Sequence, residues 1–243
     1  MILPLVTTFP PPYEHWTTRT ATHAEMMAEY QTTGKMVPFV NDQLIARVTT
    51  PLEAANYIAN VGADGGLGNH INSVLDSDAN YATWRRSMPS STPIELSKYK
   101  KQYPHCNFDQ VSDEINSVGL PISPGQFLFH AGIWPGGQFL STDRPLSTSF
   151  CPQVALRNAE HKGKAYDANR IDLFVVRATA SSTKAFAYKR KRIHLGHENE
   201  VVFASGANLR LNRSTLIRNN YSVWKSNSPQ KQVPIYVLEI DLL

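Results

Sequence analysis

Cysteine, long apolar runs and an excess of one charge are all scarce in this chain. Its 243 residues include two cysteines, Cys106 and Cys151, whose placement matches neither a metal-binding spacing nor a disulfide framework. No stretch reaches the roughly 18 apolar residues that a membrane-spanning helix needs. The apolar start Met1–Val6 is short and has no basic residue, so it is not expected to be a signal peptide.

The charge balance is only mildly basic. The formal net charge is +4, with 42% hydrophobic and 18% charged residues, which is typical of an ordinary soluble globular protein. Because the basic residues are mostly scattered, nucleic-acid binding is permitted but not indicated. The densest basic run includes Lys184 and Lys189–Arg192. A solvated loop is its plain interpretation, and a patch that attracts phosphates or an acidic surface is the alternative.

The first half of the chain, to about residue 124, has a mainly helical pattern interrupted by Pro, Thr, Ser and Asn. Helices are expected at Thr20–Gln31, Pro51–Val61, Asn69–Arg86 and Phe108–Val118. Asp109 or Ser112 is the expected cap of the last of these helices. The glycine-rich segment Gly62–Gly68 lacks the Gly-Lys-Ser/Thr ending of a phosphate loop, so we interpret it as a loop that ends a helix.

The second half changes to short runs rich in Val, Ile, Phe and Tyr, separated by turn residues. Strands are expected at Gln126–His130, Gln138–Leu140, Leu173–Ala178, Ala185–Tyr188, Glu200–Ala204 and Pro234–Leu242. A helix is expected over Pro152–Glu160, because proline is favourable in a first helical turn. The sequence therefore predicts an α+β fold, with a helical region (1–124) packed on a mostly antiparallel, two-sheet β core (125–243).

Two glutamates, Glu198 and Glu200, stand two residues apart just before an apolar run. On an extended backbone both side chains point to the same face. Neighbouring carboxylates repel each other unless a cation lies between them. A ribosyl centre that is becoming an oxocarbenium ion is such a cation, and a fixed carboxylate aimed at it stabilises charge that develops only in the transition state. A pair of exposed strand residues is the plain alternative.

Two other segments precede this pair. Ser147–Ser149 carries small hydroxyl side chains, which hydrogen-bond to backbone or to a carboxylate without filling a cleft. His130 ends an apolar strand and is followed by Ala131–Gly132, a turn that allows close backbone approach to a ligand. Taken alone, His130 is as well explained by a structural role, and Ser149 by a turn that caps the following helix.

In this order, the three segments resemble the mono-ADP-ribosyltransferase family, most of all bacterial toxins and effectors with an Arg-Ser-Glu core. The resemblance covers about residues 125–243. His130 stands where these enzymes have Arg and where the diphtheria-toxin and poly-ADP-ribose polymerase branch has His. This departure leaves open which residue handles the pyrophosphate of NAD, with Arg144, Arg47 and Arg157 as candidates.

The resemblance implies roles for the matched residues. It makes Glu200 the catalytic glutamate that holds the ribose 2′-hydroxyl, and Glu198 the residue that orients or deprotonates the acceptor. Ser147 would brace Glu200. The residues implied to line the NAD site are His130, Ala131, Gly132, Arg144, Ser147, Thr148, Ser149, Phe150 and Glu200. The aromatics Phe150 and Trp134 are stacking candidates, and Phe186 and Tyr188 stand where the family often has an aromatic that reads the protein substrate. For Phe150 and Trp134, a core role is the alternative.

The implied activity is transfer of ADP-ribose from NAD+, used as a co-substrate, to a host protein side chain with release of nicotinamide. No metal is expected, because NAD+ carries its own cationic leaving group. Ubiquitin, modified on threonine, is the specific target hypothesis, with actin and small GTPases as further members of the substrate class. The implied setting is a secreted effector acting in the host cytoplasm, with no membrane or nucleic-acid partner and an export route that the sequence does not show.

Three other functions are alternatives to this one. A glycoside-processing enzyme would use Glu198 and Glu200 as acid and base, although adjacent same-face positions lie only about 6–7 Å apart. A non-catalytic binding module would leave the motifs as strand edges and turns. A transferase that modifies nucleic acid would use the basic run at Lys189–Arg192.

Overall fold

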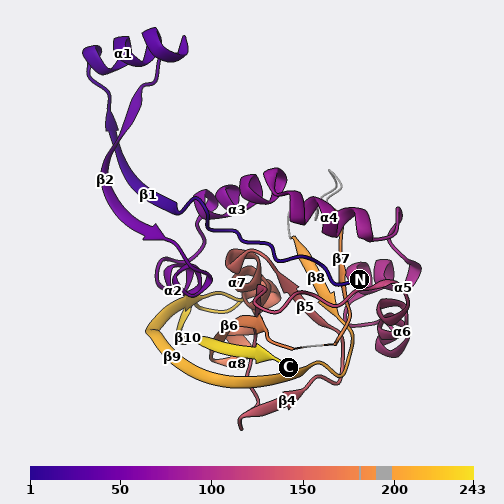
Figure 1. Cartoon of the computed structure of the whole chain (residues 1–243). Helices are drawn as coiled ribbons and strands as arrows, with labels where there is room; N and C mark the ends of the chain where they lie inside the picture. The colour runs from indigo at the N-terminus through magenta and orange to yellow at the C-terminus, as the bar shows by residue number, and fades with distance from the viewer. Residues whose placement is uncertain (181, 190–198) are drawn as a thin grey trace.

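The computed structural model describes residues 1–180, 182–189 and 199–243, and Figure 1 shows a mixed helix and sheet body with one projecting arm. The helices are α1 (His23–Thr33), α2 (Pro51–Val61), α3 (Gly65–Ser77), α4 (Ala79–Ser87), α5 (Ile94–Gln102), α6 (Phe108–Val118), α7 (Pro152–Glu160), the 3-10 helix η1 (His161–Gly163) and α8 (Lys164–Ala168). The strands are β1 (Tyr13–Thr20), β2 (Phe39–Val48), β3 (Phe127–Gly132), β4 (Phe139–Ser141), β5 (Leu146–Ser149), β6 (Ile171–Ala178), β7 (Ala185–Ala187), β8 (Glu200–Phe203), β9 (Asn208–Val223) and β10 (Lys231–Leu242). Helices dominate the first half and strands the second, which confirms the α+β class.

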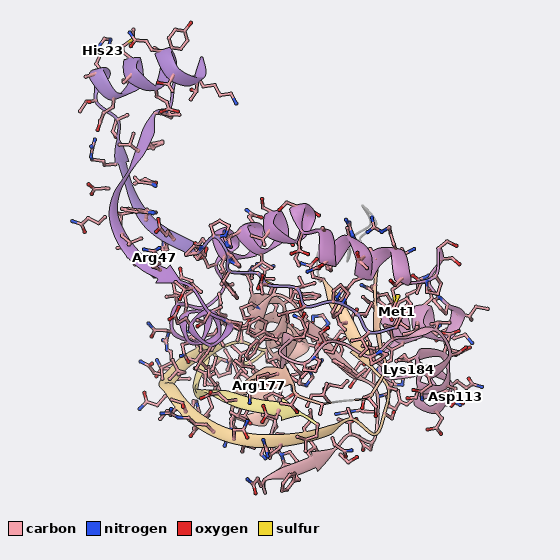
Figure 2. All side chains as sticks on the ribbon, in the orientation of Figure 1. Met1, His23, Arg47, Asp113, Arg177 and Lys184 are labelled. Atoms are coloured by element: carbon pink, nitrogen blue, oxygen red, sulfur yellow. The ribbon has the colours of Figure 1, made fainter. Side chains whose placement is uncertain are left out.

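The projecting arm consists of β1, α1 and β2. The two strands pair antiparallel, and α1 sits at the far end, where Figure 2 labels His23; Arg47 lies nearer the base. Thr22 and Glu25 form a capping box that starts α1, and Gly34, with φ of +73°, ends it. The sequence predicted a helix at this point but neither strand of the arm.

The helices of the first half differ in detail from the expected ones. The single helix expected over 69–86 is wrong, because Asp78 ends α3 and starts α4 by accepting a hydrogen bond from the Tyr81 backbone N–H at 2.6 Å. The expected loop at 62–68 is only partly right: Gly62 ends α2, but Asp64 caps α3, so Gly65 is already helical. Asn107 caps α6, instead of Asp109 or Ser112.

Eight of the described strands form one sheet, in the order β4-β9-β10-β6-β3-β5-β8-β7. Strands β6 and β10 pair parallel, and the other described pairs are antiparallel. Strands β3 and β5 are joined at one residue pair, Phe129 and Ser149, so the sheet divides there into a five-stranded and a three-stranded part. This division confirms the expected split β core.

A single buried cluster includes residues from both halves of the chain. Trp84 of α4, for example, packs edge-on against Phe150, with ring centroids 5.3 Å apart. The N-terminal segment is fixed to the sheet through Gln126, whose side chain accepts from the Val6 N–H and donates to the Val6 carbonyl. The domain boundary at residue 124 stays a prediction. In the described ranges, no helix is long and apolar enough to cross a membrane.

Candidate active site

A cleft of about 990 Å³ lies where the two parts of the sheet meet. Its lining comes from the ends of β3 and β5, the first residue of β8, the C-terminal end of α5 and the turn between α7 and α8. These elements come from distant parts of the chain. They surround the cleft near the place where β3 and β5 pair at one residue pair. Eight of the site residues expected from the sequence line this cleft: His130, Ala131, Gly132, Arg144, Ser147, Thr148, Ser149 and Glu200.

Ser147 and Glu200 meet in this cleft. In the antiparallel ladder Ser149 stands opposite Glu200 and Ser147 opposite Val202, so Ser147 and Glu200 are diagonal neighbours on one face. The Ser147 hydroxyl donates a 2.6 Å hydrogen bond to Oε1 of Glu200. The Glu200 side chain is 14% exposed, so it is held by the sheet while still reaching the cleft.

A cation also contacts Glu200. Nζ of Lys100, near the end of α5, lies 3.4 Å from Oε2 of Glu200 and 4.8 Å from the centre of the Tyr188 ring. Sequence reasoning missed Lys100, because nothing in a charged helix 100 residues earlier indicates contact with Glu200. Each carboxylate oxygen of Glu200 therefore has a different neighbour, a hydroxyl at Oε1 and an ammonium at Oε2.

His130 is a neutral group beside this pair. Its Nδ1 lies 2.6 Å from the Ser147 carbonyl oxygen, and since a carbonyl only accepts, Nδ1 carries the proton and donates it. Burial, together with the positive charges of Arg144 and Lys164, lowers the pKa of His130 to about 4, although its hydrogen bond to the Ser147 carbonyl opposes this shift. Nε2 of the neutral ring is thus an acceptor. It lies against Gly132, where an added Cβ would approach it to 3.1 Å.

The basic side chains that line the same cleft include Arg144, Lys162 and Lys164. Burial lowers the pKa of Lys164, and the charges of Arg144 and Lys162 lower it further, so these cations act on one another. Lys162 has φ of +55°, an uncommon conformation for a residue other than glycine. An anion bound among these groups would relieve their mutual repulsion.

The other pyrophosphate candidates lie elsewhere. Arg47 is on the arm, with Nε 3.7 Å from Oε1 of Glu14. Arg157 is in the last turn of α7 and is not part of the described cleft lining. Arg144 is therefore the candidate that the structure brings to the cleft.

Several expected site residues have structural partners instead. The Thr148 hydroxyl donates to the Val201 carbonyl at 2.7 Å, and Oγ of Ser149 accepts from the N–H of Cys151 at the start of α7. Phe150 has the core role that was the alternative to stacking on NAD. It is 1% exposed, and its ring packs edge-on against Tyr81 and Trp84.

The remaining aromatic candidates are also buried. Trp134 and Phe186 belong to the core, and the Tyr188 hydroxyl donates to the Leu96 carbonyl at 2.7 Å. The ring of Tyr188 nevertheless faces Lys100. Glu198 lies outside the described residues, as do Arg190–Arg192 of the basic run.

Asn199, which sequence reasoning also missed, fixes the start of β8. It is buried, has φ of +46°, and its side-chain amide donates to Oδ1 of Asn72 at 2.8 Å. Its carbonyl accepts from the Phe150 N–H at 3.4 Å. Asparagine tolerates left-handed backbone better than most residues, which explains this residue type directly before Glu200. No group of three or more His, Cys, Asp or Glu side chains within the described ranges is arranged to hold a metal ion.

No family model and no curated protein matches the chain, but solved structures do. It is similar to the enzymatic component C2-I of the C2-toxin from Clostridium botulinum, with 9% identity, 76% of this chain and 48% of that chain covered, and a TM-score of 0.40. It is also similar to the Vis toxin, an ADP-ribosyltransferase from Vibrio splendidus, with 14% identity, 93% and 88% covered, and a TM-score of 0.33. A third similar structure is BECa, an ADP-ribosylating toxin of a binary enterotoxin of C. perfringens, with NADH. The identity is 12%, 71% of this chain and 48% of that chain are covered, and the TM-score is 0.42.

The chain spans about half the length of the C2-I and BECa chains that it matches.

Proposed function

We propose that this protein is an NAD-dependent mono-ADP-ribosyltransferase, which transfers ADP-ribose to a protein side chain and releases nicotinamide. The observation that carries the proposal is the Ser147–Glu200 pair, a carboxylate fixed by a 2.6 Å hydrogen bond inside a cleft of about 990 Å³. The cleft is large enough for a dinucleotide-sized ligand, since ligand pockets typically measure about 300–1,000 Å³.

The charges of the cleft fit the charges of NAD+. The pyrophosphate is an anion, and Arg144, Lys162 and Lys164 provide cations that already repel one another. Arginine and lysine are the side chains that proteins use for phosphate groups, arginine in a bidentate manner and lysine as a point charge. We assign the binding of the pyrophosphate to these three residues. They would do what the arginine does in the enzymes that have Arg at the position of His130.

His130 would make a different contact from that missing arginine. Its Nδ1 is already used by the Ser147 carbonyl, and its neutral ring leaves Nε2 as an acceptor beside Gly132. An acceptor at this place suits a ribose hydroxyl or the amide N–H of the nicotinamide carboxamide. Gly132 leaves space for the backbone to approach the same group.

NAD+ supplies a nicotinamide leaving group and a ribose carbon that becomes positively charged as the bond to nicotinamide breaks. Glu200 would accept a hydrogen bond from the ribose 2′-hydroxyl and stabilise this developing charge. Ser147 keeps one carboxylate oxygen in place, so that the carboxylate need not reorient during the reaction.

The acceptor side chain and the target protein are more specific parts of this proposal. Glu198, proposed to orient or deprotonate the acceptor, lies outside the described residues. We propose a host protein as the substrate, with a threonine of ubiquitin as the specific hypothesis and actin or a small GTPase as alternatives. The corresponding setting is a secreted effector or toxin that acts in the host cytoplasm.

The test is labelling of a eukaryotic lysate with biotinylated NAD+. Wild-type protein should label at least one protein band, and Glu200→Gln, which keeps the shape but removes the charge, should abolish it. Glu239→Gln, the same change at a half-buried residue of β10, is the matched control and should label as wild type does. Equal labelling by Glu200→Gln and wild type would contradict the proposal, and labelling removed by nuclease but not by protease would indicate a nucleic-acid acceptor.

A further inference from the structure

Lys100 occupies a small site that has the properties of a cation-binding site. Its ammonium lies 3.4 Å from Oε2 of Glu200 and 4.8 Å from the centre of the Tyr188 ring. The Lys100 side chain is 20% exposed and that of Glu200 is 14% exposed, so the ion pair is partly shielded from water. A carboxylate and an aromatic face both attract a positive charge, and the attraction strengthens where water is excluded.

Two groups that contact the Lys100 ammonium are themselves fixed. The Tyr188 hydroxyl donates to the Leu96 carbonyl of α5 at 2.7 Å, and the ring is 7% exposed. Glu200 is held by Ser147 at 2.6 Å. Lysine, by contrast, has a flexible side chain with four rotatable bonds, and it can move its charge out of the cleft at little steric cost. A fixed carboxylate and a fixed ring therefore contact the end of a flexible side chain.

The proposed substrate carries a positive charge of its own. In NAD+ this charge lies on the nicotinamide ring and moves to the ribose carbon as the glycosidic bond breaks. If Glu200 acts on that carbon, the substrate cation and the Lys100 ammonium compete for the same carboxylate, because like charges at a few ångströms repel. Both cannot be held there at once.

We infer that Glu200 and Tyr188 form a cation subsite, which Lys100 fills until the positively charged nicotinamide riboside end of NAD+ displaces it. This inference rests on the proposed function and adds a specificity-determining residue to it. Lys100 is then an internal competitor of the oxidised dinucleotide. It does not compete with NADH in the same way, because the dihydronicotinamide ring is neutral.

The experiment compares an oxidised and a reduced dinucleotide. Dissociation constants are measured by isothermal titration calorimetry for carba-NAD+, whose ribose oxygen is replaced by CH₂ so that it is not cleaved, and for NADH. The variants are Lys100→Met and Lys100→Gln, with Lys100→Arg to keep the charge. Lys101→Met is the matched control, because Lys101 is the next residue of α5, is exposed and lines the same cleft.

We expect the two neutral variants at position 100 to bind carba-NAD+ more tightly by roughly two- to fivefold, the upper part of the range measured for exposed ion pairs. Their affinity for NADH should stay at the wild-type value. Lys100→Arg should behave as wild type, and Lys101→Met should change both affinities in the same direction. Melting curves of each variant confirm that the protein titrated is folded, and Lys100→Gln serves if Lys100→Met does not fold.

Weaker or unchanged binding of carba-NAD+ by the neutral variants, or an equal gain for both dinucleotides, would overturn the inference. Wild-type binding of both dinucleotides would leave the proposed function standing in that case. If wild type binds neither dinucleotide, the proposed function fails, and the inference fails with it.

Discussion

Replacement of Ser147 by alanine is the sharpest test of how Glu200 is held. The substitution removes the 2.6 Å hydrogen bond to Oε1 of Glu200 and leaves the backbone of β5 unchanged. A hydrogen bond to a charged group contributes about 1.5–3 kcal/mol. Since each 1.4 kcal/mol corresponds to a factor of ten, Ser147→Ala should lower kcat/KM for NAD+ cleavage by about 10- to 100-fold.

The assay is chromatographic measurement of nicotinamide released from NAD+ by purified protein. Ser112→Ala is the control, because Ser112 makes a 2.7 Å hydroxyl–hydroxyl contact with Ser205 and is not part of the described cleft lining. It removes a hydroxyl of the same kind and should leave the rate per folded molecule unchanged. A Ser147→Ala protein that melts like wild type and cleaves NAD+ at the wild-type rate would refute the bracing role.

Three other predictions concern charge, packing and the arm. Because burial lowers the pKa of His130 from 6.5 to about 4, the unfolded chain binds this proton at a higher pH than the folded chain. The stability of the protein should therefore fall as the pH falls from about 6.5 to 4. Thermal melts of His130→Gln over this pH range should show a smaller loss of stability. Gly119→Ala would place a Cβ 2.6 Å from the Ile115 carbonyl oxygen and 2.8 Å from that of Ala185. The substitution should therefore lower the free energy of unfolding, measured by urea titration, by about 1–3 kcal/mol. An unchanged urea midpoint would contradict this expectation. The arm can be deleted by joining Tyr13 to Val48, which pair at its base, through a Gly-Asn turn. Nicotinamide release should stay unchanged, since the described cleft lining lies between Tyr99 and Leu209. A loss of release in a protein that still melts cooperatively would place the arm in the active site.

Elements with a strong local signal could be predicted from the sequence. Helix α7 was predicted with its observed bounds, because Pro152 marks its first turn. Strand β6 is buried at nearly every position, and its apolar run was equally clear. Strand β9 was missed because its 16 residues are mostly polar and few are buried, and its place in the sheet comes from pairing with β10. The strands of the arm were missed for the same reason, since they also pair with each other and bury little.

The site shows the same contrast between local and long-range information. The family resemblance implied that His130, Ser147 and Glu200 line one site, and the structure brings these residues into one cleft. Lys100 and Lys164 carry no signal of their own. They reach the cleft through the packing of α5 and the turn after α7, which depends on contacts between residues far apart in the chain.

The action of Glu200 on NAD+ can be measured without a target protein. Purified wild type and Glu200→Gln are incubated with NAD+ alone, and nicotinamide release is followed over time beside a blank without protein. Wild type should release nicotinamide slowly, because water replaces the missing acceptor, and a folded Glu200→Gln protein should release it at the blank rate. Equal release by the two proteins, or none above the blank from wild type both with and without a eukaryotic lysate, would contradict the action of Glu200 on NAD+.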